Sequence, residues 1–245
     1  MSEHVELTNP VDLSVGGMSG HLFRRGIHIG MAAVPFVYFE WGEALADSIG
    51  AEVPQVVSLV ILAILAAEGI RLKMGFTIFG QRSYEAKQVS ALAWGAFGVG
   101  MVFLLAPTKA YAWPLILSLA FGDPFMGELR RRGTETKNVI LYSCVFIALI
   151  WVACWHFFAT PLWLAIVFGP LCVAAEWPRL RYIDDNATMT LIPLGLLLVL
   201  EPFLKIILLL SSLCPPFVLL LSSSCPPFVL LLSSFCPPFV LLLSS

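Results

Sequence analysis

The chain has 245 residues, of which 59% are hydrophobic and 12% are charged, and its formal net charge is −2. Soluble globular domains carry about 25% charged residues, so this chain has too little polar surface to enclose a water-facing core. The composition predicts an all-α integral membrane protein. No nucleic-acid partner is expected, and no protein partner is evident.

Seven apolar stretches follow one another along the chain. A helix needs about 20 apolar residues to cross the hydrocarbon, and fewer when partner helices surround it. We therefore predict a polytopic transmembrane bundle of about seven spans within residues 24–210. The fourth span is short and ends at Gly122-Asp123-Pro124, which predicts a broken or partly inserted helix. The spans lie near 27–46, 54–72, 89–106, 111–122, 138–159, 161–177 and 187–210.

Two segments of different character flank this bundle. Residues 1–23 are polar, whereas residues 211–245 form a near-perfect eleven-residue repeat with Cys-Pro-Pro in each copy. The paired prolines forbid a continuous helix, and each apolar run is too short to span a membrane. We therefore treat the repeat as a low-complexity tail and assign it no function.

Lysine and arginine residues gather on one side of the predicted bundle. With seven spans, the basic residues near 24–25, 71–87, 130–137 and 179–181 share one side, and only Lys109 falls clearly on the other. The positive-inside rule makes the first side cytoplasmic. Most polar residues that can do chemistry then lie at that face, whereas a transporter more often places ionisable groups near the middle of its spans.

The stretch YIDDNATMT at 182–190 places two acids and an amide where the last predicted span begins. Adjacent carboxylates repel one another unless a cation or donors lie between them, and Mg²⁺ is commonly held by one or two carboxylates plus substrate phosphates. Asp184, Asp185 and Asn186 are therefore candidates for metal and nucleotide binding. The alternative is that Asp185 or Asn186 only N-caps the helix, and the local residues favour neither interpretation.

Two more acids lie at the ends of predicted spans. Glu176 precedes Asp184 by eight residues and either pairs with Arg179 or Arg181 or shares a cavity with Asp184. Asp123 belongs to a Gly-Asp-Pro sequence, which presents the acid at a helix break but is also a common turn.

Three consecutive arginines follow that turn. Arg130, Arg131 and Arg132 could bind a polyphosphate through bidentate contacts, which makes the first two candidates for nucleotide binding. The cluster serves equally well as a topology signal, and for the cluster as a whole we favour that interpretation.

The remaining polar positions have simpler explanations. His28 stands just inside the first span, where a lone histidine is more often an interfacial residue than a catalyst. Glu68 and Arg71 have the i,i+3 spacing of an ion pair on one helix. The charged residues of 82–87 have the pattern of an ordinary solvated loop.

Taken in chain order, these motifs resemble a known family. Arg-x-x-x-His near the first span is followed by Glu-x-x-Arg, Arg-x-x-Glu, Gly-Asp-Pro, Ala-Ala-Glu and Asp-Asp-Asn-x-Thr. This series resembles the CTP-dependent polyprenol kinases, which include dolichol kinase, phytol kinase and a eukaryotic diacylglycerol kinase. It is similar more distantly to the phosphatidate cytidylyltransferases. The resemblance covers roughly residues 20–203, and its most specific parts are FGDP at 121–124 and AAEWPRLRYIDDNATMT at 174–190.

The resemblance implies a membrane-embedded kinase that transfers a phosphoryl group from CTP to a dolichol- or polyprenol-type isoprenoid alcohol. It implies Mg²⁺ or another divalent cation as cofactor, bound at the cytoplasmic face. Asp123 and Asp184 are the candidates to orient or deprotonate the acceptor hydroxyl. The positions that match the family's metal and nucleotide motifs are Asp123, Glu176, Asp184, Asp185 and Asn186, and His28 and Glu68 match weaker positions.

One departure from the family follows Gly-Asp-Pro. The family usually carries a Lys-Thr/Ser-x-Glu-Gly-Ser element there, whereas in this chain Lys137 remains as a nucleotide-binding candidate and no Glu-Gly-Ser follows it. Either the nucleotide is held differently, through Glu128 and the arginines, or the activity is altered or lost. A cytidylyltransferase that makes a CDP-lipid, and a non-catalytic membrane protein whose acids only cap and pair, remain the alternatives.

Overall fold

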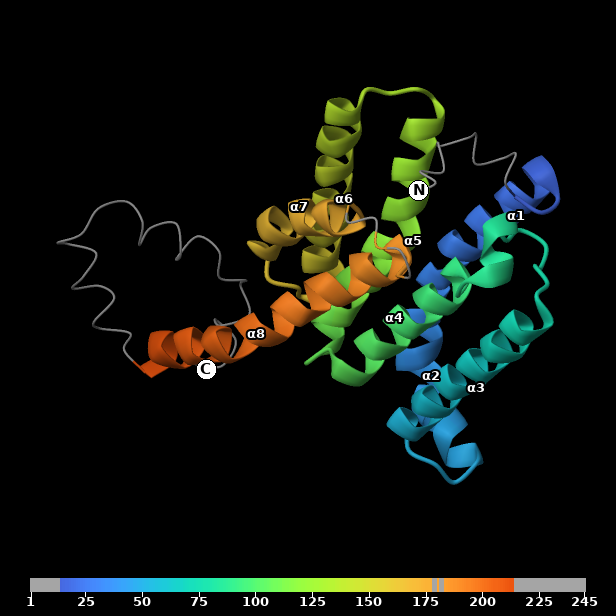
Figure 1. The fold of residues 1–245 in the computed structure, drawn as a ribbon. Helices are drawn as coiled ribbons and strands as arrows, with labels where there is room; N and C mark the ends of the chain where they lie inside the picture. The colour runs from blue at the N-terminus through green and yellow to red at the C-terminus, as the bar shows by residue number, and fades with distance from the viewer. Residues whose placement is uncertain (1–13, 178–179, 181–182, 214–245) are drawn as a thin grey trace.

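A computed structural model describes residues 14–177, 180 and 183–213, and these residues are helical with short connections (Figure 1). The all-α prediction is confirmed for this part of the chain. The repeat from residue 214 onward lies outside it. The elements are α1 (Gly17–Gly30), the 3-10 helix η1 (Met31–Ala33), α2 (Val34–Ser48), α3 (Val53–Met74), the 3-10 helix η2 (Ser83–Lys87), α4 (Ala91–Leu105), α5 (Lys109–Arg131), α6 (Thr136–Phe158), α7 (Leu164–Glu176) and α8 (Asp185–Leu213).

Within the described residues, three helices are long and apolar enough to cross a membrane: α3, α6 and the part of α8 that ends at Phe203. The helices α4 and α7 are also apolar but shorter. This is consistent with a membrane protein, and each predicted span overlaps a helix. The first predicted span is composite, because η1 joins α1 to α2. Helix α1 begins at Gly17, inside the polar segment 1–23.

Local sequence signals determine where the spanning helix α3 begins and ends. Its first turn contains Pro54, and the backbone N–H of Glu52 donates to the side chain of Gln55 at 2.9 Å. At the other end Gly75 adopts a left-handed conformation with φ 69°, which lets its N–H bond the carbonyls of Arg71 and Leu72. A capping box and a C-terminal glycine therefore bound the helix.

The prediction of a helix break at Gly122-Asp123-Pro124 is wrong. Helix α5 continues through Pro124 to Arg131. An internal proline removes one backbone hydrogen bond, at a cost of about 3 kcal/mol, so packing has to compensate. Gly122 is buried, and a Cβ atom on it would lie 3.0 Å from Ile147 Cδ1 of α6, so the two helices pack closely at this point. Asp123 is consequently presented from a continuous helix.

Helix α8 packs against both α4 and α7, while α5 and α6 form a hairpin that packs on α7 (Figure 1). The α4–α8 contact is close because α4 carries Gly98. The fully buried Thr190 of α8 lies over this glycine and donates its hydroxyl to the carbonyls of Asn186 and Ala187, both at 3.0 Å. The same contact positions the first turns of α8.

We expect Gly98→Ala to lower the free energy of unfolding by about 1–3 kcal/mol, because the added Cβ would overlap Thr190 Oγ1 and lie 3.3 Å from Thr190 Cβ. Gly69→Ala is the matched control, since no heavy atom lies within 4 Å of the added Cβ there. That variant should be stabilised by about 0.5–1 kcal/mol through helix propensity. Unfolding of both proteins in detergent measures the difference, and equal effects would contradict the close α4–α8 contact.

Candidate functional site

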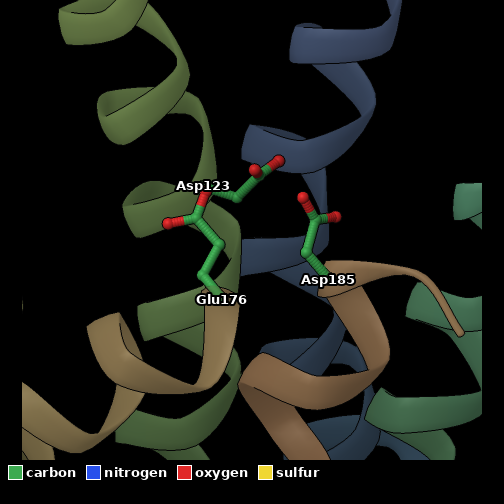
Figure 2. A group of neighbouring side chains, drawn as sticks. All are labelled: Asp123, Glu176 and Asp185. Carbon is green, nitrogen blue, oxygen red and sulfur yellow. The ribbon is translucent and has the colours of Figure 1, made fainter. Parts of the chain in front are cut away.

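Three carboxyl groups from three different helices point toward one another (Figure 2). Asp123 comes from the middle of α5, Glu176 is the last residue of α7, and Asp185 is the first residue of α8. One oxygen from each carboxyl lies within 4.8 Å of the others. Such a group of hard oxygen atoms is of the kind that Mg²⁺ prefers. We call these three residues the acidic cluster.

Asp184 has a different place from its neighbour Asp185. Its side-chain Oδ1 accepts the backbone N–H of Asn186 at 3.1 Å, and its carbonyl accepts the N–H of Ala187 at 3.1 Å. Asp184 is therefore the N-cap of α8, whereas the capping alternative from the sequence named Asp185 or Asn186. Burial raises the pKa of the Asp184 carboxyl well above its usual range, and the charge of Asp185 acts in the same direction.

The side chain of Asn186 is buried between α8 and α4. Its Nδ2 donates to Asp184 Oδ1 at 2.5 Å and to the carbonyl of Ala91 at 3.4 Å. Its Oδ1 is buried and has no hydrogen-bond partner among the residues that the structure describes. An unpaired buried acceptor costs about 1–3 kcal/mol, so an additional donor or cation would satisfy this oxygen.

His28 of α1 contacts the acidic cluster directly. The residue is only 6% exposed, and its Nδ1 lies 3.2 Å from Asp123 Oδ2. The geometry does not make this contact a hydrogen bond, and Nδ1 lacks any other partner in the described part of the chain. The predicted interfacial histidine is thus a buried residue beside one of the acids.

Glu176 forms a bidentate ion pair with Arg130. The two guanidinium nitrogens lie 2.6 Å and 3.1 Å from the two carboxylate oxygens, and Arg130 also lies over the ring of Trp177 at 5.2 Å. The Glu176 side chain is 1% exposed, whereas that of Arg130 is 40% exposed. The partners expected from the sequence, Arg179 and Arg181, lie outside the described residues.

Glu128 is the centre of a second charged group, one turn beyond the acidic cluster on α5. It accepts from Arg25 of α1, from Arg131 at 2.8 Å and from Arg132 at 2.8 Å. Hydrogen bonds from these arginines hold the pKa of the Glu128 carboxyl well below its usual range. Arg131 is therefore already paired, and Lys137 is exposed in the first turn of α6.

The predicted Glu68–Arg71 pair is confirmed, with both N–O distances at 2.8 Å. The expectation of a solvated loop at 82–87 is wrong for Glu85, which is 1% exposed and accepts from Arg24 of α1 at 2.7 Å. The sequence marks Arg24 as a topology signal and as the first residue of the Arg-x-x-x-His motif, whose i,i+4 spacing places Arg24 and His28 on one face of α1.

Comparison with protein families, curated proteins and solved structures finds no match for this chain. The geometry of the site and the motif resemblance are accordingly the basis for its functional interpretation.

Proposed function

We propose that the chain is a divalent-cation-dependent lipid kinase that transfers a phosphoryl group from CTP to an isoprenoid alcohol of the dolichol or polyprenol type. The observation that supports this most strongly is the convergence of Asp123, Glu176 and Asp185 from three helices. All three residues belong to the motifs on which the family resemblance rests.

The donor atoms suit Mg²⁺ better than a transition metal, because they are carboxylate oxygens without thiolate. Asp123 and Asp185 form no ion pair with a described lysine or arginine, so both are available as ligands. Asn186 follows Asp185 in α8, and its buried Oδ1 has no hydrogen-bond partner among the described residues. A bound Mg²⁺ would neutralise the charge on the phosphate oxygens of the nucleotide.

The role of Glu176 in this proposal is to position Arg130. Two nitrogens of that guanidinium contact the carboxylate, and the group has five N–H donors in a fixed fork, so donors remain for phosphate oxygens. Arg131 is held by Glu128 next to it, and Lys137 is exposed nearby in sequence. Arg130 is therefore the primary phosphate-binding candidate.

Asp123 is a better candidate than Asp184 for orienting the acceptor hydroxyl. The side chain of Asp184 is engaged in capping α8, whereas Asp123 lies beside the buried His28. A hydroxyl held between Asp123 and His28 would lose its proton to one of them during transfer.

The arginine residues around the acidic cluster indicate on which side of the membrane the site lies. Ion pairs join Arg24 to Glu85, Arg25 to Glu128 and Arg130 to Glu176, so basic segments distant in the sequence gather around the acidic cluster. By the positive-inside rule, a seven-span arrangement would place this end at the cytoplasmic face.

Turnover of labelled CTP in reconstituted membranes tests the proposal. We expect label from the γ-phosphate in polyprenol, together with release of CDP. Label from the α-phosphate in a CDP-lipid formed from phosphatidate, with release of pyrophosphate, would show a cytidylyltransferase instead of a kinase. If no label enters polyprenol, diacylglycerol or phosphatidate, the enzymatic proposal fails and the acids serve only to cap and pair.

A further inference from the structure

An apolar cavity of about 220 Å³ lies next to the acidic cluster, between α1, the segment 78–81 and α4. This volume is below the about 300–1,000 Å³ of pockets that enclose whole drug-sized ligands. Its apolar lining consists mainly of Phe23, Ile27, Met31, Ile78, Phe79 and Leu92.

The segment 78–81 forms one wall because it is attached to the start of α1. The N–H of Val15 donates to the carbonyl of Gln81 at 2.8 Å, and the N–H of Gly80 donates to the carbonyl of Val15 at 3.0 Å. Gly80 has φ +87°, which favours glycine, and the ring of Phe79 lies 5.6 Å from that of Phe23. The wall is thus built by specific backbone and aromatic contacts.

One end of the cavity reaches the candidate site. His28 lines it, and the Nδ1 of this residue lies 3.2 Å from Asp123 Oδ2 without a hydrogen-bond partner among the described residues. Gly95 also lines it, and a Cβ placed on Gly95 would be 3.8 Å from Asn186 Cβ. An occupant of the cavity can therefore present a polar end to His28 and Asp123.

The remainder of the cavity is open toward the surroundings of the helices. Ile78, Phe79 and Leu92 are 49%, 47% and 48% exposed, although each also lines the cavity. Leu92 lies in the first turn of α4, within the predicted span 89–106, so its exposed side chain would contact lipid close to the membrane surface. The cavity therefore has half-exposed apolar side chains at one end, and His28 connects its other end to Asp123 of the acidic cluster.

We propose that this cavity binds the hydroxyl-proximal part of the hydrocarbon chain of the acceptor lipid alcohol, with the hydroxyl facing His28 and Asp123. The inference rests on the proposed function for the identity of the occupant. The small volume accommodates only the first part of the chain, and the rest extends into the bilayer. The residues that determine acceptor specificity are then those of α1, 78–81 and α4.

Photolabelling tests this binding without requiring turnover. A geranylgeraniol analogue that carries a diazirine near the hydroxyl end is added to the protein in phosphatidylcholine nanodiscs without CTP. We expect label on peptides of α1, 78–81 and α4, and competition by unlabelled geranylgeraniol. Label spread over lipid-facing helices such as α3, or label that unlabelled geranylgeraniol does not displace, would overturn the proposal.

A pair of variants makes the test specific. Ile78→Trp narrows the cavity, whereas Ile70→Trp places the same side chain on α3, where the isoleucine is 59% exposed and does not line the cavity. Overpacking of this kind should reduce specific labelling by roughly tenfold in Ile78→Trp only. Equal labelling of the two variants would contradict the proposal. Specific labelling of the cavity without any turnover would contradict the proposed kinase activity but would still support the proposed lipid-binding cavity.

Discussion

Replacing Asp123 or Asp185 by asparagine should lower phosphoryl transfer by about a hundredfold or more, because each variant removes a charged oxygen ligand from the acidic cluster. Asparagine has nearly the same shape as aspartate, so the packing of α5 and α8 should be unchanged. The measurement is the rate of γ-phosphate transfer from CTP to polyprenol at saturating Mg²⁺, with CD spectra as a check on folding.

Two control variants distinguish the effect of losing a residue of the acidic cluster from the effect of losing another acidic residue. Asp184→Asn should retain most of the activity, since asparagine is as good an N-cap as aspartate and the residue is not part of the acidic cluster. Asp47→Asn, at an exposed position near the end of α2, should have no effect. Loss of activity in Asp184→Asn with a normal rate in Asp185→Asn would contradict the assignment.

The largest loss of stability is expected for Arg71→Met. Arg71 is 2% exposed and donates to both oxygens of Glu68 and to the carbonyls of Phe76, Glu85 and Gln88, all at 2.8–2.9 Å. Methionine fills a similar volume but leaves the buried Glu68 carboxylate without its cation. Breaking a buried pair in this way costs about 3–5 kcal/mol of unfolding free energy.

Arg132→Met is the matched control, because the Arg132 side chain is 70% exposed in its ion pair with Glu128. An exposed pair contributes about 0–1 kcal/mol, so this variant should unfold almost like the parent protein. Arg71→Lys should resemble Arg71→Met, because an ammonium group cannot reach five acceptors in fixed directions. A normal midpoint for Arg71→Met in detergent would show that the buried network contributes little.

The stability of this network also concerns the candidate site. Arg71 contacts the carbonyl of Glu85, and the side chain of Glu85 pairs with Arg24 of α1. Glu68 in turn accepts the N–H of Ser90, which caps α4 through the N–H of Ala93. The network therefore positions α4 and one wall of the apolar cavity relative to α1.

Features that depend on neighbouring residues could be predicted from the sequence. Long apolar runs predicted the helices because helix formation in a membrane is a property of the local segment. The Glu68–Arg71 pair followed from its i,i+3 spacing on one helix. The motifs that resemble the polyprenol kinases marked Asp123, Glu176, Asp184, Asp185 and Asn186, and the structure groups the carboxyls of Asp123, Glu176 and Asp185.

Features that depend on tertiary packing could not be predicted in this way. Glu176 pairs with Arg130, 46 residues away, and no local pattern connects the two. Gly-Asp-Pro usually ends a helix, but the packing of Gly122 against Ile147 accompanies a helix that continues through Pro124. Similarly, the polar Glu85 lies in the short 3-10 helix η2, where the sequence predicts a solvated loop, and contacts with α1 and α3 bury it.

The central claim is that Asp123 and Asp185 bind a divalent cation next to Arg130, which Glu176 positions. Electron paramagnetic resonance of Mn²⁺ with the purified protein in nanodiscs, with and without CTP, tests it most directly. We expect bound Mn²⁺ in the parent protein and in Asp184→Asn, strengthened by CTP, and its loss in Asp185→Asn. Mn²⁺ binding that is the same in Asp185→Asn as in the parent protein would contradict the account.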